Sequence, residues 1–278
     1  MTTPILILSF FTVLSLIPHH IIKEFPNDIN LPAIRNREVL SWEVKCLPDK
    51  LLKTMVFNNL KSYDIKTIET LIQDGAPAAK ATSLPPELTE KISGVSYDPR
   101  CIFREDLALL TIIHWGFDNA YHYGHMIVHK KLANELIEIF TELLQAHYPI
   151  EKIKLIDEYD ANDEKSMEDD NSSALCCRVV TGDEHKKNPR WSKHSFGTAI
   201  DINPLQNPYI KPAKNLLLPK NSYAYINRTI NKKGMIIKND ACYKAFVSRG
   251  WIWGGDWDTK DALGRVDYQH FEKDLNNL

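Results

Sequence analysis

The clearest regular spacing of apolar positions lies between residues 128 and 147. Apolar side chains recur there every three or four residues, which places them on one face of a helix. Tyr148-Pro149 follows, and a proline cannot continue a helix because it lacks the N–H group and its ring clashes with the preceding turn. The spacing predicts a core-facing helix over residues 128–147, with the inward positions Val128, Leu132, Leu136, Ile139, Phe140 and Leu143.

Shorter apolar runs in the second half of the chain predict strands. Residues 198–202 (Thr-Ala-Ile-Asp-Ile) are rich in β-branched side chains and predict a short buried strand. Residues 153–156 and 177–180 predict two more strands. Asp240 is suited to be the N-cap of a helix that ends at Gly250.

The part of the chain before residue 96 has weaker signals. Asp64 is suited to cap a helix that ends at Gly75, with apolar residues at helical spacing between them. Three prolines then predict a linker: Pro77, Pro85 and Pro86. No chemistry can be assigned to this stretch. We therefore expect an N-terminal extension over residues 26–95, which packs on the main domain or holds a partner, and a main domain over residues 96–278.

The chain begins with an uncharged apolar run over residues 4–18. This run is shorter than the roughly 20 residues that cross a membrane, and it fits the apolar centre of a secretory signal. No lysine or arginine precedes it and no small-x-small cleavage site follows, so a buried N-terminal strand or helix is the alternative. We expect residues 1–25 to direct export to the periplasm or cell envelope, either as a cleaved signal or as an anchor.

Composition narrows the class of protein. The chain has 278 residues, is 44% apolar and carries a net charge of −2, as expected for a globular protein with a large core. Neither value suggests a nucleic-acid partner. The cysteines are Cys46, Cys101, Cys176, Cys177 and Cys242, an odd number without a C-x-x-C pair, which excludes a zinc finger. In an exported protein one disulfide could form, and the spacing does not assign it.

Two stretches combine metal-ligand chemistry. His194 and Asp201 lie seven residues apart with Gly197 between them, and Asp267 and His270 lie near the end of the chain. Two imidazoles and one carboxylate can hold a catalytic zinc ion and leave its fourth position for water. Asp267 is then free to act as a general base. The pattern predicts a zinc hydrolase with His194, Asp201 and His270 as ligands.

Each of these residues also has an ordinary structural explanation. His194 could be a loop histidine with satisfied hydrogen bonds, and Asp201 could form a turn. However, an aspartate within an apolar strand is costly unless it is paired or bound to a metal, which favours a site. His125 and His129 have helical spacing, yet Met126 stands where the helix of a zinc protease requires glutamate, so we assign a structural role to them and to His147.

The same residues resemble a known family. Ser-x-His-x-x-Gly-x-Ala-x-Asp over residues 192–201, followed by Asp-x-x-His-Phe over residues 267–271, is similar to zinc D-alanyl-D-alanine carboxypeptidases and L-alanyl-D-glutamate peptidases of the VanY-like type. The resemblance extends from about residue 96 to residue 273 and includes four further segments: Asn171–Arg178, Asn203-Pro204, Asn207-Pro-Tyr209 and Gly250–Trp257.

The resemblance implies a fold and several roles. The family has the Hedgehog/DD-peptidase fold, so we expect an α+β domain whose antiparallel sheet holds the site and whose helices pack on one face. Arg178 corresponds to the family's arginine that polarises the scissile carbonyl and stabilises the oxyanion, and Ser192 to a residue that contacts substrate. Asp267 would take a proton from water and deliver it to the leaving amine. The expected substrates are the stem peptides of peptidoglycan.

The surroundings of the predicted site have distinct compositions. Residues 157–170 are strongly acidic and contain an Asp-x-x-Ser pattern at Asp163 and Ser166 that resembles the family, so we expect a solvated rim of the active site. Residues 211–238 contain seven lysines and arginines and no acid, which indicates a solvated loop or flap. Trp251, Trp253 and Trp257 are expected to form a buried wall beside the metal.

Three questions stay open from the sequence. Asp267 and His270 are three residues apart, so their side chains would point to opposite faces of a regular strand, and the mechanism requires a turn between them. The sequence does not choose between a D-Ala-D-Ala bond and an L-Ala-D-Glu bond. A non-catalytic zinc-containing module that binds the cell wall, or a zinc amidase, would have the same ligands.

Overall fold

The computed structural model describes residues 77–183, 185–257 and 264–275. Helices and mainly antiparallel strand pairs alternate along these residues, so the architecture is α+β, as predicted. In this part of the chain no helix is both long and apolar enough to span a bilayer. The predictions for the N-terminal apolar run, the helix capped by Asp64 and Cys46 lie outside the described residues.

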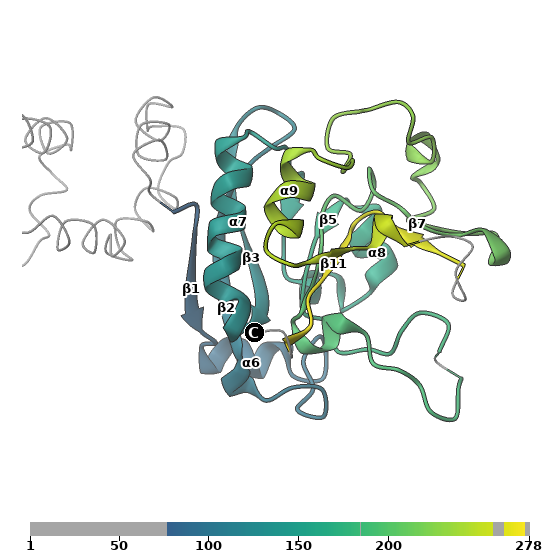
Figure 1. Cartoon of the computed structure of the whole chain (residues 1–278). Helices are drawn as coiled ribbons and strands as arrows, with labels where there is room; N and C mark the ends of the chain where they lie inside the picture. The colour runs from purple at the N-terminus through teal and green to yellow at the C-terminus, as the bar shows by residue number, and fades with distance from the viewer. Residues whose placement is uncertain (1–76, 184, 258–263, 276–278) are drawn as a thin grey trace, which may run out of the picture. The chain divides into compact units, whose positions relative to one another are not determined.

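The first layer is an antiparallel sheet covered by the longest described helix. The strands β1 (Ala79–Ser83), β2 (Leu107–Trp115) and β3 (Tyr121–His129) pair in the order β1-β2-β3. Helix α7 (Ala133–Gln145) lies across this sheet and beside α9 (Figure 1). Its buried side chains pack with those of β2 and β3 in one core cluster, which includes Leu110, Ile112, Met126, Leu136, Ile139 and Phe140.

The predicted start of this helix is wrong by five residues. Strand β3 continues to His129, where Val128 pairs with Ala108, and a 3-10 turn η3 (Lys130–Leu132) precedes the helix. The consecutive apolar residues Met126, Ile127 and Val128 suit a strand buried on both faces, and Val128 matches the helical spacing by coincidence. His125 and His129 consequently lie on a strand and not on a helix.

The predicted linker is also wrong. β1 pairs with β2, and helix α6 (Pro86–Ile92) follows directly. Pro86 occupies the first turn of α6, where a missing N–H group has no cost and the fixed φ angle suits a helix. Ile92 is fully buried in a second cluster with Tyr97 and Leu175. The described residues just before position 96 therefore pack in the same sheet and core as those after it, one of the two arrangements expected for the extension.

The second half of the chain forms two small antiparallel sheets. One has the order β6-β11-β9, with β6 (Ala199–Asp201), β11 (His270–Glu272) and β9 (Ile252–Trp253). The other has the order β10-β7-β8, with β10 (Val266–Asp267), β7 (Tyr209–Lys211) and β8 (Leu216–Leu218). The shorter elements are β4 (Lys152–Ile153), β5 (Asn171–Ser172), α8 (Asp163–Glu168), α9 (Ala241–Val247), η2 (Arg104–Asp106), η4 (Ile156–Tyr159), η5 (Lys193–Phe196), η6 (Pro212–Lys214), η7 (Tyr223–Tyr225) and η8 (Gly254–Asp256).

Three local predictions have different outcomes. The strand at residues 198–202 is confirmed as β6, and the helix capped by Asp240 as α9, since the Asp240 side chain accepts a hydrogen bond from the Tyr243 N–H. At residues 153–156 only Ile153 lies in a strand, because η4 begins at Ile156. Residues 177–180 make a single bridge, Val179 with Trp191, and no strand.

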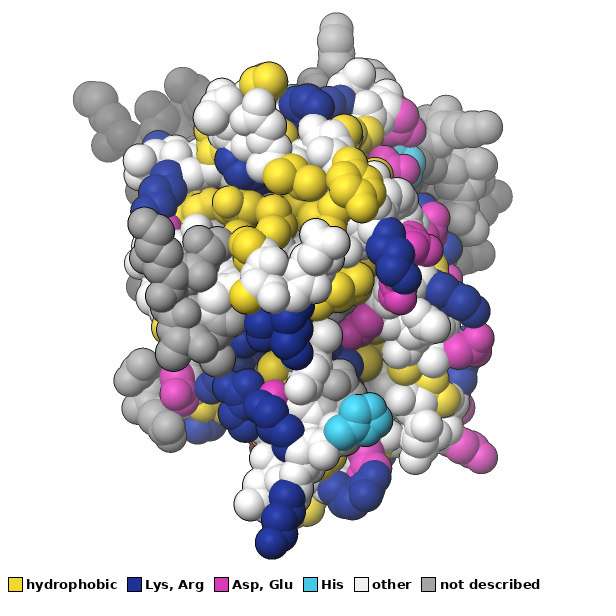
Figure 2. Space-filling view, turned by 90° about the vertical axis from the view of Figure 1, so that its right-hand side faces the viewer, with side chains coloured by type: hydrophobic (Ala, Val, Ile, Leu, Met, Phe, Trp, Pro, Cys, Tyr) yellow, Lys and Arg dark blue, Asp and Glu magenta, His cyan; other side chains and the backbone are white. Residues whose placement is uncertain are grey.

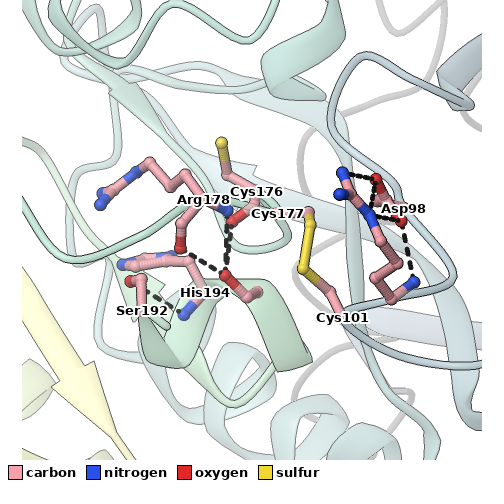
Figure 3. The surroundings of a disulfide bond; sticks show 9 residues. Asp98, Cys101, Cys176, Cys177, Arg178, Ser192 and His194 are labelled. Atoms are coloured by element: carbon pink, nitrogen blue, oxygen red, sulfur yellow. Dashed lines mark hydrogen bonds and ion pairs between the residues drawn. A yellow bond between two sulfur atoms is a disulfide. The ribbon is translucent and has the colours of Figure 1, made fainter. Parts of the chain in front are cut away.

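A disulfide joins Cys101 to Cys177 across 76 positions of sequence. Cys176 and Cys242 are buried free thiols. Figure 3 shows that the disulfide lies beside the segment that contains Arg178 and close to His194. The Cys177 N–H also donates to the Ser96 carbonyl at 2.8 Å. The covalent bond therefore fixes this segment to the turn at residues 98–101.

The disulfide is expected to contribute about 4 kcal/mol to the free energy of unfolding, because it closes a long loop in the unfolded chain. Denaturant unfolding of the oxidised wild-type protein should therefore show a higher midpoint than the same protein with a reducing agent. The double variant Cys101→Ser/Cys177→Ser is the control, since its midpoint should not respond to the reducing agent. Equal midpoints for the wild-type protein in both conditions would contradict the pairing.

Candidate active site

The three predicted metal ligands meet at the antiparallel pair β6–β11. Register places His270, the first residue of β11, opposite Asp201, the last residue of β6. His194 lies on η5, the turn that precedes β6, and is buried like the other two. Residues 76 positions apart in sequence are thus brought together, and no other group of this kind occurs among the described residues.

Gly197 explains how η5 reaches this position. Its φ angle of 64° is in the left-handed region, where η5 ends. Its carbonyl accepts a hydrogen bond from the His129 N–H at 2.8 Å, and a Cβ atom at Gly197 would lie 2.6 Å from that nitrogen. A side chain would therefore both strain the backbone and separate the turn from β3. Glycine allows the close approach that places His194 beside β6.

The potential ligand atoms form a compact triangle. His194 Nε2 lies 3.2 Å from Asp201 Oδ2 and 3.2 Å from His270 Nδ1, and His270 Nδ1 lies 3.0 Å from Asp201 Oδ1. In a tetrahedral zinc site with bonds of 2.0–2.1 Å, neighbouring ligand atoms are about 3.3–3.4 Å apart. Asp201 uses one oxygen toward His194 and the other toward His270, and one ligand atom from each residue lies within 4.8 Å of the other two, a spacing compatible with a shared metal ion.

The hydrogen bonds of the two imidazoles show which nitrogens face the triangle. His194 Nδ1 lies 2.6 Å from the Ala174 carbonyl oxygen, which can only accept, so Nδ1 must donate a proton. His270 Nε2 lies 3.1 Å from Glu272 Oε2 and donates to that carboxylate. In neutral imidazoles the other two nitrogens then present lone pairs to each other and to Asp201. Three converging lone pairs repel unless a cation lies between them, and histidines supported in this way are typical metal ligands.

The electrostatics of the protein alone agree with a cation site. Burial disfavours the charged form of Asp201, but His194 and His270 outweigh burial and hold the pKa of Asp201 below its ordinary value. Burial also opposes a charge on His270, but hydrogen bonds to Asp201 and Glu272 outweigh it and raise the pKa of His270 to about 10. The lowered pKa of Asp201 and the raised pKa of His270 both show that the pocket favours a positive charge. A proton can supply this charge, and so can a metal ion bound by His194, Asp201 and His270.

Asp267 lies beside this group without belonging to it. It ends β10, and a turn at residues 268–269 separates it from His270, as the mechanism required. Its Oδ1 atom is buried and has no hydrogen-bond partner among the described residues. Burial raises the pKa of Asp267 to about 6; His270 opposes this shift and Asp201 adds to it. The carboxylate also has a side-chain hydrogen bond with Gln269, so one of its oxygens is without a partner. A carboxylate with a free buried oxygen and a pKa near neutrality is well suited to accept a proton.

Arg178 reaches the same cleft from the disulfide-bonded segment. Its Nε forms an ion pair with Asp163 on α8, and both side chains line the cleft. Ser195 holds its backbone: the Ser195 hydroxyl accepts from the Arg178 N–H at 3.0 Å and donates to the Arg178 carbonyl at 2.7 Å (Figure 3). Burial opposes the charge of Arg178, but Asp163, Cys176, Asp201 and Asp267 outweigh it and raise its pKa.

Ser192 lies at the start of the turn that contains His194. Its hydroxyl accepts a hydrogen bond from the His194 N–H at 3.3 Å and so caps η5. The side chain is buried and is not among the residues that line the cleft. The structure therefore gives Ser192 a role in orienting the turn of His194, and its contact with substrate stays a prediction.

The cleft over these residues has a volume of about 500 Å³. Residues of the acidic segment line it, namely Asp163, Glu164 and Ser166 of α8, in agreement with the predicted rim. The tryptophan wall is only partly correct. Trp257 lines the cleft, 5.5 Å from the His270 ring between ring centres. Trp251 and Trp253 are instead buried in the main core, because β9 directs them toward α9 and its neighbours.

The basic segment 211–238 is more than a solvated loop. It contains β8, from which Leu218 lines the cleft, and Lys220 forms an ion pair with Glu164 of α8. Arg228 turns inward and donates to the carbonyls of Gln206 and Ile236, both at 2.7 Å. The segment therefore packs against the rim of the cleft, and part of its charge is used internally.

Sequence reasoning missed the residues that support the site. Glu272 and the Ala174 carbonyl orient the two imidazoles, and Ser195 holds Arg178. Glu272 could have been found, because residues two positions apart on a strand share a face and His270 begins β11. The contribution of Ala174 comes from its backbone, which no side-chain pattern reveals.

Comparison with known families supports the same stretch. The family model described as D-alanyl-D-alanine carboxypeptidase matches residues 186–273, which include all three ligands and Asp267 but not Arg178. Searches among curated proteins and among solved structures found no match. The resemblance predicted from the motifs is supported over this stretch, since residues 186–273 are similar to the D-alanyl-D-alanine carboxypeptidase family.

Proposed function

We propose that this protein is a zinc metallopeptidase that hydrolyses a peptide bond in peptidoglycan stem peptides. The bond would be D-Ala-D-Ala in a carboxypeptidase or L-Ala-D-Glu in an endopeptidase, and the fold that of the Hedgehog/DD-peptidase group. The observation behind the proposal is the convergence of three potential ligand residues beside the partnerless Oδ1 atom of Asp267, within the stretch that matches the family.

The residues divide the work of hydrolysis among them. His194, Asp201 and His270 would hold zinc, which when bound lowers the pKa of water and polarises a carbonyl group. Asp267 accepts the proton of the attacking water and delivers it to the leaving amine. Arg178 faces the cleft and stabilises the negative charge that develops on the carbonyl oxygen. Glu272 and the Ala174 carbonyl keep the two imidazoles in the required tautomers.

The role of Arg178 predicts a selective loss. Arg178→Ala should reduce hydrolysis by roughly 10²–10³-fold, as for the removal of an oxyanion donor, while zinc content stays at the parental level. Arg190→Ala is a matched control, because Arg190 also lines the cleft but pairs with Asp183. Turnover of stem peptide and elemental analysis measure the two effects. A parental rate for Arg178→Ala would remove Arg178 from the mechanism.

Digestion of purified peptidoglycan tests the proposal directly. Mass spectrometry of the released fragments identifies the bond: loss of a single D-alanine indicates a carboxypeptidase, and larger peptides indicate an endopeptidase. Release of intact stem peptides from the sugar would indicate an amidase. A zinc-loaded protein that binds peptidoglycan and cleaves no bond would instead be a wall-binding module, which the presence of both Asp267 and Arg178 argues against.

We propose export to the periplasm or cell envelope on two grounds. A cell-wall peptidase must reach its substrate outside the cytoplasm, and the disulfide between Cys101 and Cys177 is of a kind that persists in oxidising compartments. A reporter fused behind residue 30 should appear outside the cytoplasm. A reporter that stays wholly in the cytoplasm would contradict the role of residues 1–25.

A further inference from the structure

Four Lys and Arg side chains line the described cleft, and they differ in their partners. Arg178 pairs with Asp163, Arg190 with Asp183, and Lys193 with Asp274 at 3.8 Å. Among the residues that the structure describes, Arg265 has no carboxylate within ion-pair distance. Among the Lys and Arg side chains of the described cleft, Arg265 is thus the one without a close ion pair, and its charge acts on Glu272 only at longer range.

The position of Arg265 is nevertheless defined. Its guanidinium carbon lies 4.3 Å from the centre of the Trp257 ring, a cation–π contact that orients the planar group. Trp257 in turn lies against the His270 ring. The Nε atom of Arg265 is buried and has no hydrogen-bond partner in the described part of the chain. A buried donor without a partner is costly, so this site is suited to a ligand that accepts hydrogen bonds.

Both signs of charge occur around the cleft. Figure 2 views the molecule from the side of β7 and shows Lys and Arg side chains in the lower half of this face, with Asp and Glu side chains among them and apolar side chains above. Carboxylates also line the cleft, so the attraction for an anionic group is local to a cation that has no ion-pair partner.

We propose that Arg265, held by Trp257, is a specificity-determining residue that binds a carboxylate of the substrate on the His270 side of the metal site. The guanidinium fork matches a carboxylate in shape and can donate two parallel hydrogen bonds to it. The inference rests on the proposed peptidase function and narrows it to peptides with a carboxylate close to the scissile bond. Two sources supply this group in stem peptides: the C-terminal carboxylate of D-alanine and the free carboxylate of the glutamyl residue.

Matched peptide pairs can test this and identify the source. One pair has a free C-terminus or a C-terminal amide, and the other has glutamate or its amide at the glutamyl position. The wild-type enzyme should prefer the acid of one pair. Arg265→Met should raise KM for that acid by about 10–100-fold, the range expected for a charge-assisted hydrogen bond, and should leave the amide unchanged. The pair that loses its discrimination identifies the carboxylate.

Three controls make the result specific. Arg265→Lys keeps the charge but not the fork, so it should retain part of the preference for the acid. Arg190→Met removes another cation of the cleft and should affect acid and amide alike. Zinc content and the unfolding midpoint of each variant show whether the site and the fold are intact.

Failure of the inference differs from failure of the proposed function. If the wild-type enzyme cleaves stem peptides and Arg265→Met reduces acid and amide cleavage equally, the carboxylate subsite is wrong and the peptidase proposal stands. If no peptide is cleaved, calorimetric binding of the same four peptides to the zinc-loaded protein decides the question. Acid-selective binding that Arg265→Met removes would support the subsite, and equal binding of acids and amides would overturn it.

Discussion

Replacement of His194, Asp201 or His270 by alanine is expected to remove the bound zinc and all measurable hydrolysis. The parental protein should hold one zinc ion per chain. Each of the three residues supplies one ligand atom within 4.8 Å of the other two, and a site that has lost one of three ligands binds zinc much more weakly. Elemental analysis after dialysis measures the loss. Full zinc content in all three variants would show that the metal binds elsewhere.

Two further variants separate ligation from general damage. His125→Ala changes a histidine on β3 that is outside the metal group, so this variant should keep its zinc. Glu272→Gln preserves size but weakens the hydrogen bond that orients His270, and loss of such a supporting partner typically lowers metal affinity by about 10–100-fold. Zinc affinity should therefore be unchanged in His125→Ala, reduced in Glu272→Gln and lost in His270→Ala. This order is a sharper test than the ligand variants alone, because it would not arise if these residues only stabilised the fold.

The site could be predicted from the sequence better than the scaffold around it. His194, Gly197 and Asp201 lie within one short stretch, so local rules for a tight turn and a buried strand were enough to place them. Asp267 and His270 were added because of their chemistry and the family resemblance, and the turn that their spacing requires is present in the structure. The pairing of β6 with β11 then follows from the need of all three ligands to meet.

The scaffold depends on contacts between distant segments, which local patterns do not contain. The apolar spacing at Val128 is compatible with the buried face of a helix and with a buried strand. In the structure Val128 pairs with Ala108 and therefore belongs to the strand. Composition alone places Pro86 at the end of a linker. In the structure Pro86 begins α6, a helix whose Ile92 is buried in a core cluster. The partner of Cys177 is 76 positions away, so only the fold could assign the disulfide.

The tryptophans show the same limitation within a short segment. Trp251, Trp253 and Trp257 are close in sequence and were expected to share one environment. Trp251 packs edge to face on Phe246 of α9, and Trp253 donates from its ring nitrogen to the Tyr268 carbonyl at 2.8 Å. Only Trp257 follows η8 into the cleft. Aromatic composition indicates burial but not which of two neighbouring cavities a side chain fills.

Asp267→Asn is expected to lower hydrolysis of stem peptide by about 10²–10⁴-fold, the usual contribution of a general base. Asparagine has the same size as aspartate but cannot accept a proton from water at neutral pH. The three ligands are unchanged, so zinc content should stay at the parental level. Asp256→Asn is a matched control, because Asp256 lies nearby on η8 but pairs with Lys238 and does not line the cleft. This control should keep the parental rate.

The pH dependence gives an independent signature of the same carboxylate. Asp267 must be ionised to accept a proton, so kcat/KM should rise as the pH passes above the pKa of Asp267. Burial raises this pKa to about 6 in the metal-free protein, and a bound cation would lower it, which places the acidic limb at or below about pH 6. The limb should be lost in Asp267→Asn and kept in Asp256→Asn. If Asp267→Asn cleaves stem peptide at the parental rate with an unchanged acidic limb, the general base is another residue. The burial of the Asp267 Oδ1 atom would then be a feature of the fold and not of the mechanism.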